Sequence, residues 1–74
     1  MILYEVHTST FWHAKCSVFV VALDAARLVS VLHPRRVLFV SRLDGPFRHW
    51  LCTFRNGRVV VSFLNTPEFS QVEA

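Results

Sequence analysis

The sequence predicts an α+β domain in which one helix packs on one face of an antiparallel sheet of four to five strands, in the order ββαβββ. Short apolar runs rich in β-branched residues recur along the chain and are typical of strands. Residues 25–33 carry apolar side chains at helical spacing, and Asn56-Gly57 is typical of a two-residue hairpin turn. With 74 residues the chain is one domain, expected at 1–64, followed by a polar tail at 65–74.

The first half is expected to hold two strands and the helix. Residues 2–8 form the first strand, and residues 16–23 contain a β-branched and aromatic run that favours a buried second strand. Asp24 follows as the expected helix N-cap, because its carboxylate can accept backbone N–H groups of the first turn. Pro34 ends the helix. An alternative stays open, since residues 17–33 also fit one long helix with an apolar stripe.

The second half predicts a meander of three strands, at residues 35–43, 49–55 and 58–64. Asn56-Gly57 sets the register of the last two strands, because a type I′ turn needs a positive φ at both central positions. Arg55 then faces Arg58, and regular pairing continues with Thr53 opposite Val60. One face of this hairpin is apolar and is assigned to the helix. It holds Trp50, Cys52, Phe54, Val59, Val61 and Phe63.

The opposite face is the predicted functional surface. It mixes arginine with aliphatic residues, and an apolar patch bordered by arginine is typical of a protein interface. The predicted protein-binding residues are Arg36, Leu38, Val40, Arg42, Leu51, Arg55, Arg58, Val60 and Leu64. Their aliphatic members form the expected centre, while the arginines set orientation and association rate. The alternative is that another segment of the chain covers part of this face.

The composition favours a binding module over an enzyme. Apolar residues make up 53% of the chain, the formal net charge is +3, and seven of the eight basic residues are arginine. This mild positive charge attracts acidic partners. Paired carboxylates and Gly-rich phosphate loops are missing from the sequence, so we expect no enzymatic activity, no cofactor and no small-molecule substrate. The two cysteines, the N-terminal residues and the lack of a long apolar run predict a cytoplasmic protein that does not bind membranes.

Two histidines precede cysteines at a spacing known from zinc sites. The pairs are His13 with Cys16 and His49 with Cys52. Residues three apart on a regular strand point to opposite faces, so that His49 and Cys52 could converge only at a bulge. This geometry disfavours both a zinc site and a Cys–His nucleophile. We therefore expect no bound metal and no catalytic residue.

The alternative function is a basic nucleic-acid-binding domain or a metal-independent, toxin-like ribonuclease. A ribonuclease site would cluster His49 with Arg55 and Arg58 on one face of the sheet, with Arg42 as a further candidate. Binding of single strands would need aromatic side chains beside the basic ones on an open face. Because Trp50 and Phe54 are assigned to the core face, this class of partner is the weaker expectation.

The layout resembles that of small phage-encoded anti-CRISPR proteins. The matching stretch runs from residues 18–26, a strand followed by Asp24 and a helix, through Trp50-Leu51 to Asn56-Gly57 and its return strand. The resemblance implies a non-enzymatic inhibitor that binds a host nucleoprotein complex in the host cell cytoplasm. Many such inhibitors are acidic mimics of DNA, whereas this chain is basic, so an acidic or apolar protein surface is the expected partner. Homodimerisation through the arginine and aliphatic face is the other expectation.

Overall fold

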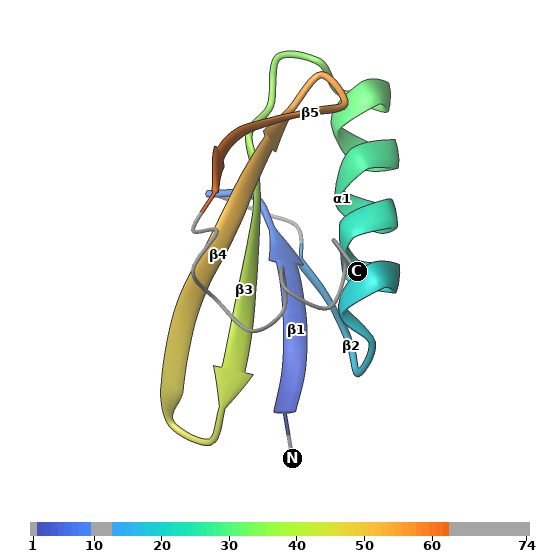
Figure 1. Ribbon diagram of the computed structural model, residues 1–74. Helices are drawn as coiled ribbons and strands as arrows, with labels where there is room; N and C mark the ends of the chain where they lie inside the picture. The colour runs from blue at the N-terminus through green and yellow to red at the C-terminus, as the bar shows by residue number, and fades with distance from the viewer. Residues whose placement is uncertain (1, 10–12, 63–74) are drawn as a thin grey trace.

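The computed structural model describes residues 2–9 and 13–62, which form an antiparallel sheet of five strands with one helix packed on one face (Figure 1). The elements are β1 (Ile2–His7), β2 (His13–Cys16), α1 (Phe19–Leu32), β3 (Leu38–Asp44), β4 (Phe47–Arg55) and β5 (Arg58–Ser62). Within the sheet the strand order is β2-β1-β3-β4-β5. The predicted α+β class and the ββαβββ order of elements are therefore confirmed.

The segment on both sides of Asp24 is helical. Helix α1 begins at Phe19, so the predicted strand at 16–23 is wrong and the alternative of one long helix is confirmed. Each buried helix residue lies three or four positions from another buried residue, so together they form one stripe that faces the sheet. They are Phe19, Ala22, Leu23, Ala26 and Ser30. The predicted N-cap at Asp24 is also wrong, since Asp24 is exposed within the helix and Val18 occupies the N-cap without a side-chain hydrogen bond.

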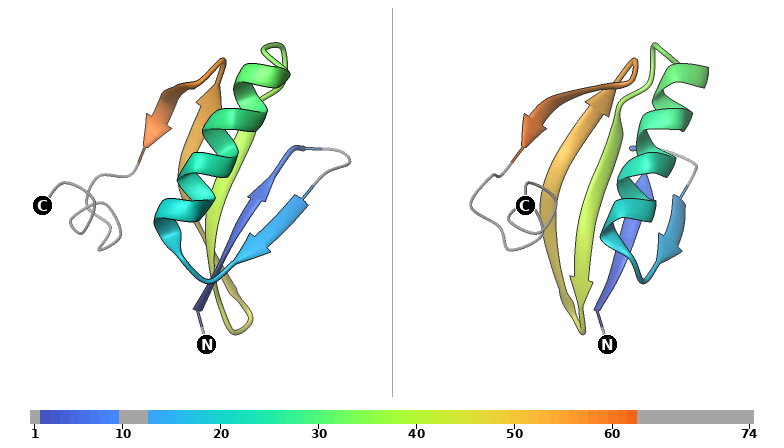
Figure 2. Two further views of the ribbon diagram at one scale, coloured as in Figure 1. Left: turned by 90° about the vertical axis from the view of Figure 1, so that its right-hand side faces the viewer. Right: turned by 45° about the vertical axis from the view of Figure 1, so that its right-hand side comes forward.

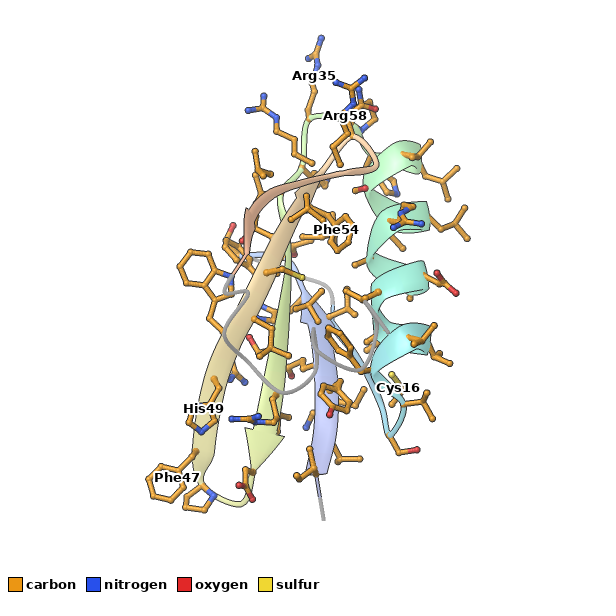
Figure 3. The ribbon with its side chains drawn as sticks, viewed as in Figure 1. Cys16, Arg35, Phe47, His49, Phe54 and Arg58 are labelled. Carbon is orange, nitrogen blue, oxygen red and sulfur yellow. The ribbon has the colours of Figure 1, made fainter. Side chains whose placement is uncertain are left out.

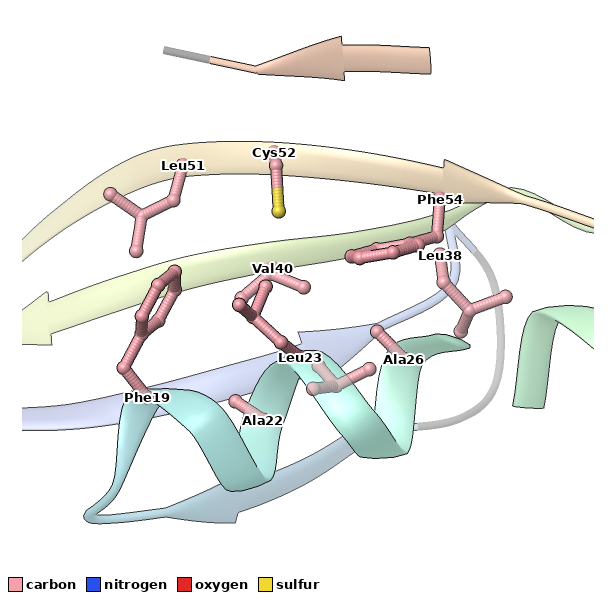
Figure 4. Packing of buried hydrophobic residues seen from close by; sticks show 10 residues of the cluster. Phe19, Ala22, Leu23, Ala26, Leu38, Val40, Leu51, Cys52 and Phe54 are labelled. Carbon is pink, nitrogen blue, oxygen red and sulfur yellow. The ribbon is translucent and has the colours of Figure 1, made fainter. Parts of the chain in front are cut away.

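The hydrophobic core lies between α1 and the sheet (Figure 4). Helix α1 packs along the sheet and contacts β1, β2, β3 and β4 (Figure 2). Ala22 and Ala26 have no exposed surface, and their small side chains let the helix approach the strands closely. Phe19 closes one end of the core, with its ring centroid 5.4 Å from that of Tyr4. The sheet is thus covered on one face by the helix.

A bulge in β4 decides which side chains of the meander face the helix. Val40 pairs with Cys52, but the next residue of β3, Ser41, pairs with Trp50, so Leu51 is the extra residue of the bulge. An extra residue reverses the alternation of side chains along a strand. Trp50 and Cys52 would share a face in a regular strand, and the bulge places them on opposite faces.

The predicted assignment of faces is wrong because it assumed a regular ladder. Leu38, Val40 and Leu51 were expected at the centre of an exposed surface, yet each has 0% exposure and packs in the core beneath α1 (Figure 4). Trp50 was expected in the core, and 43% of its surface is exposed. Without the bulge Val40 would lie opposite Leu51, and the two side chains would share the face to which the sequence-based prediction assigned both. The core positions of Cys52 and Phe54 are confirmed.

The last strand pair carries a second irregularity. Arg55 pairs with Arg58 and Phe54 with Val59, as predicted, but Thr53 then pairs with Val61 rather than with Val60. Val59 is 47% exposed, so its predicted place in the core is wrong. The register beyond this shift therefore differs from the regular hairpin expected from the turn.

The turn between β4 and β5 has the predicted backbone and is held against the helix. Asn56 has a φ of 51° and Gly57 a φ of 78°, the left-handed values that a type I′ turn requires. The Gly57 N–H donates to Ser30 Oγ at 2.7 Å, and this hydroxyl donates to the Arg27 carbonyl at 2.8 Å. A Cβ atom on Gly57 would lie 2.7 Å from Val31 Cγ2. The hairpin is thereby docked on the C-terminal half of α1.

Two further predictions concern the C-terminal residues and membrane-spanning segments. Phe63, Leu64 and the tail at 65–74 lie outside the described residues. Across residues 2–9 and 13–62, no helix combines the length and the apolar character needed to cross a membrane.

Candidate functional site

Four arginines gather at one end of the molecule, which we call the arginine end. Arg35 and Arg36 belong to the connection from α1 to β3, while Arg55 and Arg58 flank the β4–β5 turn. All four are exposed. Figure 3 shows the labelled side chains of Arg35 and Arg58 close together at this end. The fold thus brings two separate basic segments of the chain together.

The arginine end is built by backbone contacts at the end of α1. The His33 N–H donates to the Val29 carbonyl at 2.9 Å, and the Arg36 N–H donates to the His33 carbonyl at 2.9 Å, which sets the direction of the connection. The bond from Gly57 to Ser30 adds the hairpin turn at 2.7 Å. A shallow hollow of about 280 Å³ is lined by Leu32, His33, Pro34, Arg35 and Arg36.

The carboxylates of the described chain lie elsewhere. Glu5 Oε1 forms an ion pair with Arg48 Nη2 at 2.7 Å. Asp24 lies in the middle of α1, and Asp44 ends β3 at the opposite end of the molecule (Figure 1). Among residues 2–9 and 13–62, the acidic side chains therefore lie away from the arginine end. Such an end attracts carboxylates or phosphates.

Part of the predicted binding surface comes together at this end. Arg36, Arg55 and Arg58 are three of the predicted residues, and Val60 is 58% exposed on the adjoining strand β5. Arg42 lies within β3, where it pairs with Tyr4 and His49 and is half-buried. Sequence reasoning missed Arg35, although its position beside Arg36 just before a strand was available as a signal. Leu64 is outside the described residues.

The predicted ribonuclease cluster does not form. His49 lies near Phe47 toward one end of β4, whereas Arg58 lies at the other end of the molecule (Figure 3). The His49 side chain is exposed and Cys52 is fully buried, so the two do not share an environment. Burial raises the pKa of the Cys52 thiol to about 12, which keeps it protonated and unreactive near neutral pH. Within the part of the chain that the structure describes, no three His, Cys, Asp or Glu residues are grouped to hold a metal ion.

The aliphatic surface that the sequence placed on the sheet lies instead on α1. We call it the outer helix face, and its side chains are between 51% and 65% exposed. It consists of Val20, Val21, Leu28, Val31 and Leu32. Asp24 and Arg27 are also exposed on this face. Sequence reasoning missed it because the first turns of the helix were assigned to a strand.

An aromatic row crosses the opposite face of the sheet. It consists of His7, Phe39 and Trp50, from the adjacent strands β1, β3 and β4. His7 stacks on Phe39 with ring centroids 5.3 Å apart, and Phe39 meets Trp50 edge to face at 6.1 Å. The Trp50 Nε1–H is shared between Thr53 Oγ1 at 2.9 Å and the Cys52 carbonyl at 3.1 Å. The sequence-based objection to an open aromatic face, that Trp50 belongs to the core, therefore does not hold.

Comparison of the chain with protein-family models, with curated proteins and with solved structures finds no match. We therefore infer function from the chemistry of the arginine end, the outer helix face and the aromatic row.

Proposed function

We propose that this chain is a non-enzymatic protein-interaction module that pairs with a second copy of itself through the outer helix face. The observation that supports this function is the exposure of aliphatic side chains along α1, between 51% and 65% for Val20, Val21, Leu28, Val31 and Leu32. A helix that is apolar on all sides is normally buried on all sides. A contiguous apolar patch on a folded monomer is typical of an interaction site.

The charges of this face favour a second copy over an unrelated partner. Val20, Asp24, Arg27 and Val31 follow one another at spacings of three and four residues and therefore share one stripe of the helix. Asp24 and Arg27 are equally far from the middle of α1, as are Val20 and Val31. When two copies pack antiparallel about a two-fold axis, each Asp24 faces Arg27 of the other copy and each Val20 faces Val31. Such a surface is self-complementary.

The arginine end is compatible with this arrangement. It lies at the C-terminal end of α1, so antiparallel pairing places the two arginine ends at opposite ends of the dimer. Their positive charges are then far apart and stay accessible to acidic partners. The binding of a host nucleoprotein complex, the cytoplasmic location and the absence of enzymatic activity stay predictions of the sequence.

Sedimentation equilibrium at several protein concentrations tests the proposed function. The wild-type chain is expected to show a dimer that dissociates on dilution. Leu28→Glu places a charge on the outer helix face at a residue that is 62% exposed, so the variant is expected to fold and to remain a monomer.

Val60→Glu is the matched control, because Val60 is 58% exposed but lies on β5, where the sequence-based prediction put the interface. This variant is expected to dimerise as the wild type does. A monomeric wild type at every concentration, or a dimer broken by Val60→Glu and not by Leu28→Glu, would show that the proposed surface is wrong.

A further inference from the structure

The aromatic row lies on the sheet face that α1 does not cover. Leu38 and Val40 of β3 point into the core, so Phe39 between them points away from the helix. The contacts of Phe39 with His7 and with Trp50 place all three rings on that face. Trp50 keeps 43% of its surface exposed despite these contacts. An aromatic surface of this kind stacks on other flat, unsaturated rings.

The indole of Trp50 is held in place before any ligand arrives. Its N–H bonds to Thr53 Oγ1 at 2.9 Å and to the Cys52 carbonyl at 3.1 Å, so the ring lies along β4 over Thr53, which is only 5% exposed. Phe39 fixes the ring from the side of β3 at a centroid distance of 6.1 Å. A fixed ring loses little conformational entropy when it binds, and this favours affinity.

Positive charge adjoins the aromatic row on the same strand. Side chains alternate along β4 after the bulge, so Arg55 lies on the same face as Thr53 and about 7 Å further along the strand. Arg55 belongs to the arginine end, which also contains Arg35, Arg36 and Arg58. The carboxylate of this face in the described chain, Glu5, is 5% exposed and ion-paired with Arg48. This face of the sheet therefore carries aromatic side chains that can stack on a base and, next to them, the cationic side chains of the arginine end.

We propose that this face binds single-stranded nucleic acid, with a base stacked on Trp50 and neighbouring phosphates held by the arginine end. Aromatic stacking combined with a positively charged track is the general way in which proteins bind single strands without strong sequence preference. A duplex hides the faces of its bases and offers Trp50 nothing to stack on. An acidic protein would use the arginines but would leave the aromatic row without a role. The proposal does not depend on dimerisation, because the outer helix face lies on the other side of the molecule.

Binding of a fluorescein-labelled deoxythymidine oligonucleotide, followed by fluorescence anisotropy at 50 mM salt, tests the proposal. The wild-type chain is expected to bind this oligonucleotide more tightly than the same length of duplex DNA. Trp50→Ala is expected to weaken binding about tenfold, the usual effect of losing one stacked base. Trp50→Phe keeps a ring and is expected to stay within about threefold of the wild type.

Phe47→Ala is the matched control for loss of an aromatic ring. Phe47 is 66% exposed at the start of β4, toward the end of the molecule opposite the arginines, and its loss should leave binding unchanged (Figure 3). Circular dichroism confirms that each variant is folded. Quenching of Trp50 fluorescence by the oligonucleotide, measured in a Trp12→Phe background where Trp50 is the remaining tryptophan, reports stacking directly.

The salt dependence of binding tests the arginine end. Each phosphate contact contributes about 0.7 to the slope of log affinity against log salt for a single strand. Arg55→Gln and Arg58→Gln together are therefore expected to lower the slope by about 1.4. Arg27→Gln removes one positive charge from the helix side and is expected to leave the slope unchanged.

Several outcomes would overturn the proposal. They are absence of binding at 50 mM salt, equal affinity for duplex and single strand, equal affinity for polyglutamate, and a Trp50→Ala variant that binds as well as Phe47→Ala. Leu28→Glu, which tests dimerisation, separates the two proposals. A monomeric Leu28→Glu variant that still binds the oligonucleotide supports this inference whatever happens to the proposed dimer.

Discussion

The Trp50 indole donates a hydrogen bond to the hydroxyl of Thr53, with 2.9 Å between Nε1 and Oγ1. Residues three apart on a regular strand point to opposite faces and do not meet in this way. The contact exists because Leu51 is an extra residue in β4, which turns Trp50 onto the face of Thr53. One bulge therefore buries Leu51, exposes part of Trp50 and creates the hydrogen bond that orients the indole.

Thr53→Val tests the contribution of this hydrogen bond. The variant keeps the shape of the side chain and removes the acceptor, while Trp50 Nε1–H retains the Cys52 carbonyl at 3.1 Å. We expect a loss of about 1 kcal/mol in the free energy of unfolding, measured by urea denaturation. Thr53→Ser keeps a hydroxyl and is expected to preserve more of the stability. Equal stability of the valine variant and the wild type would show that the bond contributes nothing to the fold.

Leu51→Ala tests whether the bulge residue belongs to the core. Leu51 has no exposed surface, so its truncation should lower the free energy of unfolding by about 2–5 kcal/mol. Leu51→Glu would bury an unpaired charge and is expected to unfold the chain. Val60→Glu, at a residue 58% exposed, is the control and should remain folded. A folded, stable Leu51→Glu variant would return Leu51 to the exposed face that the regular register predicted.

The contrast between the β4–β5 turn and the bulges further along the strands shows what local sequence determines. Asn56-Gly57 predicts its turn because few residues accept a positive φ, and the pairs next to the turn, Arg55 with Arg58 and Phe54 with Val59, follow correctly. The error begins further along, where bulges interrupt both strand pairs of β4. A bulge depends on how side chains such as Leu51 fill the space under the helix, and that tertiary effect leaves no local signal.

The start of the helix was also predicted wrongly, but for a different reason. Valine at positions 18, 20 and 21 favours a strand locally, while Ala22, Ala25 and Ala26 favour a helix. Periodicity could not decide, because the outer helix face is apolar as well as the inner one. The errors in the helix and in the register also changed which residues were assigned to the predicted binding surface. The pairing of Arg55 with Arg58 was predicted correctly, because both residues adjoin the turn.

Gly57→Ala tests the docking of the hairpin on α1. Its φ of 78° is unfavourable for alanine, and the added methyl group would lie 2.7 Å from Val31 Cγ2. The two effects together should cost about 1–3 kcal/mol of stability. Ser30→Ala leaves the backbone conformation of the turn unstrained and removes the acceptor of the Gly57 N–H, so a smaller loss of about 1 kcal/mol is expected. Thermal unfolding of both variants checks the order.

The buried Cys52 thiol should make the free energy of unfolding depend on pH in the alkaline range. Burial raises its pKa in the folded state from 9.0 to about 12, whereas the thiol of the unfolded chain ionises near 9. Between these two pKa values the folded state keeps the thiol proton while the unfolded state loses it. The free energy of unfolding therefore falls as the pH rises above about 9, and below that pH the stabilisation due to the thiol proton is fully present. Cys52→Ala should flatten the decline of stability between pH 9 and 11 relative to the wild type. An identical decline in both proteins would contradict the raised pKa.

Reversal of the charges on the outer helix face tests the antiparallel orientation of the proposed dimer. Asp24→Arg alone sets arginines against each other in both symmetry-related contacts, and Arg27→Asp alone does the same with carboxylates. Each exposed ion pair contributes about 0.2–1 kcal/mol, so either single variant should raise the dimer dissociation constant several-fold. The double variant, Asp24→Arg with Arg27→Asp, restores opposite charges and should regain most of the affinity.

The Arg27 guanidinium also lies 6.0 Å from the Phe54 ring centre, so the stability of each variant must be measured separately. A double variant as weak as the sum of the single ones would contradict pairing of Asp24 with Arg27, since only contacting residues compensate one another.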